Sequence, residues 1–394
     1  MRLVNWHRNA LLTFGSTLLV FAVAEVLARA LWDPGGYRPI VQADPVYGWK
    51  LAPNTSVRSV DTDRRLRYDV AVNSWGWRDP ERPRAKRPGT KRVLFLGDSI
   101  VFGTGVQMGE RTGDSLDRAL GDGVEFVNAA VAGWGTDQQY LYLVREGFAV
   151  DPDVVVLGLC MANDVTNNML GHNLFGTAPK PRFELHEGEL VYRAPGLRPP
   201  APRSRAVGRF LQHSRFLHYV GRHVRILRAR ARSSPPPEPG LPYYPEDLAN
   251  DESNWSIYRV EYSEQLEKAF KVTEALIRAM HDSCAARDIP FVLFAFPQKV
   301  EVDGAARQRE MAHFGYAPEW FDFQQPYVRV RNLAETLGCR YVYPLQTFRE
   351  HGDSAQLFLQ RDSHPSPTGH ALAAQSLLPT AQEALRLPIQ RTQR

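Results

Sequence analysis

Five short strand-like runs, separated by longer segments with helical periodicity, constrain this chain more than any other feature of its sequence. Most are rich in β-branched and aromatic residues, and they cover residues 93–96, 124–131, 154–159, 291–296 and 340–343. Helical patterns lie between or after them, at residues 137–147, 257–286, 327–337 and 369–385. Strands that alternate with helices pair in parallel and are buried on both faces. The sequence therefore predicts an α/β domain with a central parallel sheet.

The first of these runs leads directly into Gly97-Asp98-Ser99. In open α/β sheets, ligands bind beyond the carboxyl ends of the strands, so we expect Ser99 at a binding site. A serine at the start of a loop or helix also has a backbone N–H that is free to stabilise an oxyanion. The alternative, from this segment alone, is that Asp98 or Ser99 is only an N-cap or turn residue.

A serine nucleophile needs a histidine base, a group that orients the histidine, and oxyanion donors. Near the C-terminus, Asp362 and His364 are close enough for one loop to present both. Gly133 lies in a turn after the second run and leaves its N–H accessible, and the side-chain amide of Asn163 follows the third run. Because these residues follow strand ends, one cleft is expected to collect them.

With these residues in this order, the chain resembles the SGNH (GDSL-type) hydrolases over about residues 92–387. The four blocks of that family are matched, in order, by Gly97-Asp98-Ser99, Gly133, Asn163-Asp164, and Asp362 with His364. The resemblance implies a flavodoxin-like three-layer α/β/α fold and ester cleavage through an acyl-enzyme, without a cofactor. It implies Ser99 as nucleophile, His364 as base and Asp362 as its orienter. The implied oxyanion hole consists of the N–H groups of Ser99 and Gly133 and the side chain of Asn163.

Two blocks depart from the family pattern. Met161 stands where the third block has glycine, and a single residue separates Asp362 from His364 where the family has two. We expect Asp362 to orient the histidine from a shorter loop, with a backbone carbonyl as the alternative. His370 is the alternative base, and Asp164 is expected to be structural.

The N-terminal segment carries the one membrane signal in the sequence. Residues 10–32 are almost entirely apolar and are preceded by Arg2 and Arg8. The length suits a bilayer, and the flanking charges place the N-terminus in the cytoplasm and the rest of the chain outside it. Glu25 and Arg29 are four residues apart and can pair on one helical face. We expect an uncleaved single-pass anchor, with a signal peptide cleaved near residues 28–30 as the alternative.

The remaining chain is predicted to divide into an extension at 33–91 and a catalytic domain at 92–388. In the extension, residues 70–79 predict a strand and turn that pack on the main domain, or alternatively a loop that forms part of the site.

The catalytic domain contains an insertion at 167–253. Within it, residues 203–232 carry nine arginines and no acidic residue. This part is either an amphipathic helix on anionic lipid or polyanionic glycan, or a surface helix whose apolar stripe covers the core.

Composition limits the function classes. The net charge of +5 is small and the basic residues are scattered, which argues against nucleic-acid binding. Cys160, Cys284 and Cys339 fit no metal-ligand spacing, so no metal is predicted. Residues 103–105 lack the further glycines and lysine of a phosphate-binding loop.

The predicted function is a membrane-anchored, extracytoplasmic serine esterase that acts on an O-acyl ester of a cell-envelope glycan or lipid. The alternatives are an O-acyltransferase with the same triad and a non-catalytic binding or assembly protein.

Overall fold

The chain forms two units in the computed structural model. One comprises residues 1–36 and 198–237, and the other comprises residues 37–197 and 238–394. The structure describes residues 2–31, 40–60, 67–172, 179–196, 214–217, 219–221, 224, 251–352, 354–359 and 364–386.

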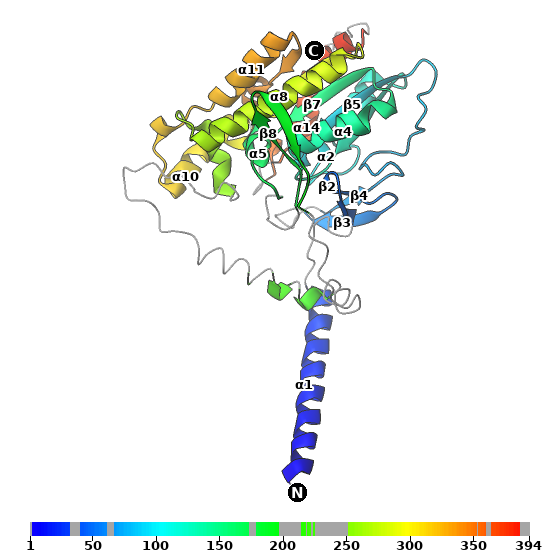
Figure 1. The fold of residues 1–394 in the computed structure, drawn as a ribbon, viewed down its shortest axis with the longest axis vertical. Helices are drawn as coiled ribbons and strands as arrows, with labels where there is room; N and C mark the ends of the chain where they lie inside the picture. Colours follow the sequence, from blue (N-terminus) through cyan, green and yellow to red (C-terminus); the bar gives the residue numbers. More distant parts are fainter. Residues whose placement is uncertain are drawn as a thin grey trace. The chain divides into compact units, whose positions relative to one another are not determined.

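The larger unit is built on a five-stranded parallel sheet with the order β11-β10-β7-β5-β6, and Figure 1 labels its strands β7 and β5. The strands are β5 (Lys91–Gly97), β6 (Val124–Ala130), β7 (Val154–Leu159), β10 (Phe291–Ala295) and β11 (Arg340–Val342). Numbered along the chain and read from the β6 edge, these five strands run 2-1-3-4-5, which is the flavodoxin-like order. The prediction of a central parallel sheet is confirmed.

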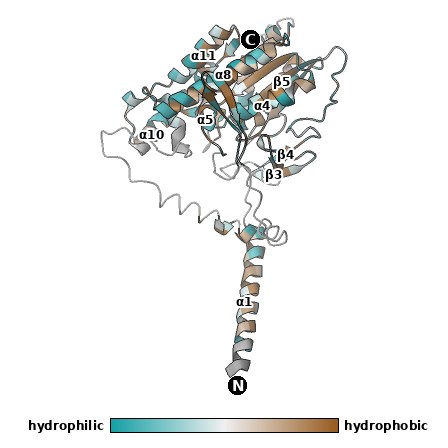
Figure 2. Cartoon of the chain, viewed as in Figure 1, coloured by the Kyte–Doolittle hydropathy of each residue, from teal (hydrophilic) through white to brown (hydrophobic). Residues whose placement is uncertain are grey.

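Helices cover both faces of this sheet. On one face, α3 (Thr112–Leu120) packs against α14 (Pro367–Ala384). On the other face, α8 (Glu264–Ala285) packs against α4 (Thr136–Arg145), α5 (Met161–Asn167) and α11 (Gln325–Leu337), and it crosses in front of the sheet in Figure 1. All residues of β6, β7 and β10 are buried, and the hydrophobic colour of β5 in Figure 2 shows the same core. The expected three-layer arrangement is thus present.

Short helices complete the larger unit. They are α2 (Ser99–Phe102), α9 (Lys299–Val302), α10 (Gly304–Phe314), α12 (Leu345–Glu350) and α13 (Ser354–Leu357), together with the 3-10 turns η2 (Gly147–Val150), η3 (Asp251–Tyr258) and η4 (Pro318–Trp320). The helix predicted from residue 257 begins at Glu264 instead. Ser263 caps it, because its hydroxyl accepts a hydrogen bond from the Leu266 N–H at 3.1 Å.

Three antiparallel hairpins are attached to this α/β core. Two lie in the extension: β1 (Val41–Asp44) pairs with β2 (Gly48–Leu51), and β3 (Ser56–Val60) pairs with β4 (Arg67–Ala71). Trp49, Val70 and Trp77 of the extension are buried in the hydrophobic core. The third hairpin joins β8 (Arg182–His186) to β9 (Glu189–Arg193) within the insertion.

The smaller unit contains the long helix α1 (Arg2–Leu31). Residues Arg8–Leu31 are long and apolar enough to cross a membrane, a property that signal sequences share. Glu25 accepts hydrogen bonds from the Arg29 guanidinium (2.8 Å) and the Ser214 hydroxyl (2.7 Å), which confirms the expected Glu25–Arg29 pair. It also accepts from the Arg215 and Phe216 N–H groups, each at 3.1 Å. Most of the basic segment 203–232 lies outside the described residues, so both interpretations of it stay predictions.

Candidate active site

The link between β5 and α2 places Ser99 at the carboxyl end of β5, an interior strand of the sheet. Asp98 is the N-cap of α2, since its Oδ1 accepts the Ile100 N–H at 2.9 Å. Helix α2 ends after one turn at Gly103, which adopts a left-handed conformation with φ 81°. The two sequence-based interpretations of this segment are therefore compatible: Asp98 is the N-cap residue, and Ser99, the expected nucleophile, is the first residue of the helix.

Two glycines allow α2 to lie close to the sheet. A Cβ atom built on Gly97 or on Gly158 of β7 would overlap the side chain of Val101. Gly97 is thus needed for space rather than for an unusual backbone angle. Gly158 was not singled out in the sequence, although a glycine inside a buried strand can mark the close approach of another backbone.

His364 reaches Ser99 from the opposite end of the sequence. Its Nε2 lies 2.7 Å from the Ser99 Oγ, and both residues are half-buried. His364 precedes α14, and its carbonyl accepts the Leu359 N–H at 2.9 Å. The structure thus brings together the expected nucleophile and base at hydrogen-bond distance. Asp362, the expected orienter of the histidine, lies outside the described residues.

Asn163 lies in α5, directly after β7, and contacts Asp98, the N-cap residue of α2. Its Nδ2 donates to Asp98 Oδ2 at 3.1 Å, and both side chains are buried. Burial raises the pKa of the Asp98 carboxyl above its usual range. Because an amide nitrogen carries two hydrogens, this contact leaves one N–H of Asn163 for a ligand.

Gly133 lies in the turn after β6, the neighbour of β5. It has φ 83°, and the turn is closed by a hydrogen bond from the Trp134 N–H to the Val131 carbonyl at 3.0 Å. Among the described residues, the N–H groups of Ser99 and Gly133 have no hydrogen-bond acceptor. The three expected oxyanion donors therefore follow the carboxyl ends of three adjacent strands, β6, β5 and β7.

Asn163→Ala is expected to lower kcat for a simple ester such as 4-nitrophenyl acetate by about 10²–10³, the usual effect of removing one oxyanion donor. Asn168→Ala is the matched control, because Asn168 is also buried and its Nδ2 donates to the Thr273 hydroxyl at 2.8 Å. Initial rates and thermal unfolding of both variants separate chemistry from stability. Equal rates in the two variants would contradict an oxyanion role for Asn163.

His370, the alternative base, contacts a different partner. It is fully buried on α14, and its Nδ1 lies 2.9 Å from the Thr112 hydroxyl of α3. Burial is the largest cause that lowers the pKa of His370, to about 3. A histidine held neutral in the core serves packing between α3 and α14, whereas His364 is the histidine at Ser99.

The pKa of His370 predicts how stability depends on pH. Above its ordinary pKa of 6.5, the imidazole is neutral in both the folded and the unfolded chain, so it adds no pH dependence. Below 6.5, only the unfolded chain binds the proton, so the free energy of unfolding falls by about 1.4 kcal/mol per pH unit, down to a pH of about 3. His370→Gln should flatten this part of the curve in urea unfolding. Parallel curves for the two proteins would show that His370 is protonated equally in both states.

The other polar residues near the strand ends have structural partners. The Asp164 Oδ2 accepts the Cys160 N–H at 2.7 Å, and burial raises the pKa of Asp164 well above its usual range. This contact at the start of α5 agrees with the structural role expected for Asp164. The three cysteines are free, and Cys160 and Cys284 are buried. Among the described residues, no group of His, Cys, Asp or Glu side chains is arranged to hold a metal ion.

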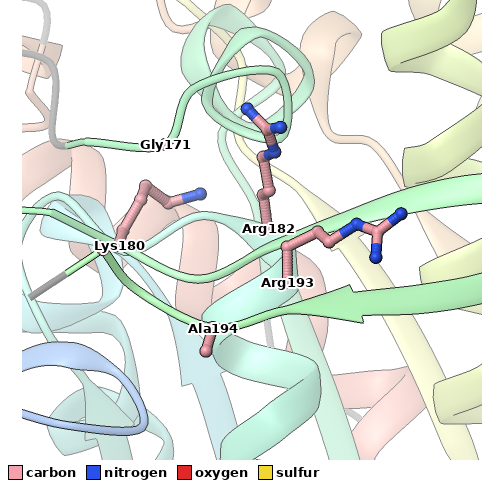
Figure 3. Close-up of a pocket in the computed structure, with 6 residues that line it drawn as sticks. Gly171, Lys180, Arg182, Arg193 and Ala194 are labelled. Carbon is pink, nitrogen blue, oxygen red and sulfur yellow. The ribbon is translucent and has the colours of Figure 1, made fainter.

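A cavity of about 180 Å³ opens at the base of the β8–β9 hairpin (Figure 3). Its basic side chains already have partners. Lys180 pairs with Asp137, and Arg182 and Arg193 pair with Glu184 at 2.8 and 2.9 Å. Neither Ser99 nor His364 lines this cavity, so it is separate from the candidate active site.

No protein-family model and no curated protein matches this chain. Among solved structures, it is similar to the acetylxylan esterase Axe2 from Geobacillus stearothermophilus, with 14% identity, 78% of this chain and 100% of the enzyme covered, and a TM-score of 0.37. TesA is 13% identical, with 75% and 99% covered and a TM-score of 0.38. A GDSL-like lipase from Bacteroides thetaiotaomicron is 12% identical, with 75% and 88% covered and a TM-score of 0.35.

Proposed function

We propose that this chain is a serine esterase of the SGNH type. The observation that carries the proposal is the 2.7 Å contact between His364 Nε2 and Ser99 Oγ at the carboxyl end of β5. A hydroxyl hydrogen-bonded to an imidazole is the arrangement that activates a serine for nucleophilic attack. The position of Ser99 at the start of α2 also places its N–H where an oxyanion can accept it.

In the proposed first step, the His364 Nε2 takes the proton of Ser99 while the Ser99 Oγ attacks the ester carbonyl. The negative charge that develops on the carbonyl oxygen is stabilised by the N–H groups of Ser99 and Gly133 and by the free N–H of Asn163. His364 then gives its proton to the leaving alcohol as the C–O bond breaks. This leaves the acyl group on Ser99.

In the second step, His364 takes a proton from a water molecule, and the resulting hydroxide attacks the acyl-enzyme. The carboxylic acid leaves and the proton returns to Ser99. We propose Asp362 as the group that orients His364, on the sequence evidence alone. The contact of Asn163 with Asp98 supports the assignment of its amide, because the carboxylate fixes the orientation of the amide next to the nucleophile helix.

We further propose that α1 is retained as a membrane anchor, with the catalytic domain outside the cytoplasm. The support is the contact of Glu25 with Ser214, Arg215 and Phe216, which cleavage near residues 28–30 would remove. A buried or membrane-embedded carboxylate is costly unless it has such partners. A catalytic domain anchored there meets acylated glycans and lipids of the cell envelope, and we propose an O-acyl ester on one of these as the substrate.

The test is covalent labelling with a fluorophosphonate probe, which reacts with activated serines. The full-length wild type should be labelled, and Ser99→Ala should not. A wild type that neither takes up the probe nor hydrolyses 4-nitrophenyl acetate would contradict the proposal and favour a binding or assembly protein. If labelling succeeds, excess sugar acceptor in the ester assay separates the two enzymes: free acid indicates an esterase, and acylated sugar indicates a transferase.

A further inference from the structure

Arg78, from the extension, binds the end of the nucleophile helix. Only 1% of this residue is exposed, and its guanidinium donates to the carbonyls of Phe102 at 3.0 Å and Gly103 at 2.5 Å. It also donates to the carbonyls of Val106 at 2.6 Å and Asp69 at 3.0 Å. Arg78 therefore ties the extension to the last residue of α2 and to the turn that follows it.

Helix α2 depends on such contacts because it is a single turn. A helix this short has little stability of its own, and its last carbonyls have no partners within the helix. A guanidinium at this end supplies donors and a favourable charge. Asn128 adds a further side-chain contact at this end of α2, because its Nδ2 donates to the Val101 carbonyl at 2.9 Å. The position of Ser99, at the start of this turn, is thus linked to Arg78.

The extension also contacts the turn that carries Gly133. The Trp49 indole N–H donates to the Ala132 carbonyl at 3.3 Å, and the Trp134 indole N–H donates to the Trp49 carbonyl at 3.0 Å. A Cβ atom on Gly133 would lie 3.6 Å from the Trp49 ring. The β1–β2 hairpin therefore packs directly on the backbone that presents the Gly133 N–H.

We propose that the extension is a positioning element of the active site. Arg78 positions the Ser99 hydroxyl through α2, and Trp49 positions the Gly133 N–H through its turn. This inference rests on the proposed function, since it assigns effects on the esterase reaction. Neither residue is assigned contact with the reacting atoms, so both are positioning residues.

Arg78→Lys tests the first half of the inference, with Arg92→Lys as its matched control. Arg92 is also a fully buried arginine, and its guanidinium donates to the carbonyls of Arg84 (3.0 Å), Pro83 (3.2 Å) and Val150 (2.6 Å). It lies at the other end of β5 from Ser99. In the full-length chain, both variants should lower Tm. Only Arg78→Lys should lower kcat, by about ten- to a hundredfold with KM unchanged, because a small displacement of a reacting group has effects of this size.

Trp49→Phe tests the second half, with Trp255→Phe as its control. The two tryptophans are 5% and 6% exposed, and each indole N–H donates one hydrogen bond at 3.3 Å, to Ala132 O and to Glu310 Oε2. We expect only Trp49→Phe to lower kcat, by roughly tenfold, and to slow fluorophosphonate labelling of Ser99. This pair also keeps the inference testable if Arg78→Lys fails to fold.

The inference is contradicted if Arg78→Lys or Trp49→Phe loses no more kcat than its control while Tm falls equally in both. That result would make the contact purely structural. Failure of the proposed function is distinguishable, because a wild type without labelling or turnover would fail before any variant is compared. A lower kcat in all four variants would also contradict the inference, since the effect would then follow stability and not position.

Discussion

Ser99→Ala is expected to reduce the turnover of 4-nitrophenyl acetate by on the order of 10⁴–10⁶, to a residual rate that depends on binding and the oxyanion donors. The expected loss is this large because the hydroxyl forms the covalent bond to the acyl group, and no neighbouring side chain can replace it. The fold should be unaffected, since the Ser99 side chain is half-buried and its recorded hydrogen-bond partner is His364. Steady-state rates and thermal unfolding measure the two expectations separately.

Ser283→Ala on α8 is a suitable control for this variant. Ser283 is also half-buried, and its hydroxyl donates to the Ala279 carbonyl at 2.7 Å, so its loss tests the effect of removing a bonded hydroxyl elsewhere. This control should keep the wild-type rate. A Ser99→Ala protein with more than a few per cent of wild-type turnover would remove Ser99 from the mechanism.

His364→Ala is expected to lower kcat by roughly 10⁴ or more, because the serine loses its general base and the leaving alcohol loses its acid. His364 is half-buried, so the substitution leaves a space open to solvent. Added imidazole should therefore restore part of the rate in the variant and leave the wild type unchanged. Initial rates across an imidazole series measure this rescue.

The control for this variant is His281→Ala, because His281 is half-buried on α8, away from the sheet's carboxyl ends, and its Nδ1 contacts Asp282 at 2.9 Å. It should show neither the loss nor the rescue. If His364→Ala kept its rate and His370→Gln lost it, the assignment of the base would be reversed, against the 2.7 Å contact of His364 with Ser99.

The inner strands could be predicted from sequence because both faces of β6, β7 and β10 are buried. The run at 154–159 coincides with β7, and all six residues of that strand are buried. Burial also explains why the sequence predicts a start of α8 that is several residues too early. Trp255, Ile257 and Tyr258 are apolar and buried, but they belong to the 3-10 turn η3, which periodicity does not separate from a helix.

Some residues of the candidate site could be predicted from the sequence, and others could not. Ser99 could be found because its motif directly follows a buried strand, and His364 because it belongs to the last block of a recognisable order. Arg78 and Trp49 could not, because their contacts join segments that are distant in sequence and match no motif. The 70–79 segment was expected to pack on the main domain or to form part of the site. It does pack on the main domain, and through Arg78 it also holds the nucleophile helix.

The space that Gly97 and Gly158 leave for Val101 links three positions on three different elements. None of them can change freely, because a larger residue at either glycine requires a smaller one at position 101. As related chains diverge, we therefore expect positions 97, 101 and 158 to covary, even where the surrounding sequences no longer show detectable similarity. Covariation of these three positions would then identify distant relatives of this chain better than the Gly97-Asp98-Ser99 motif alone.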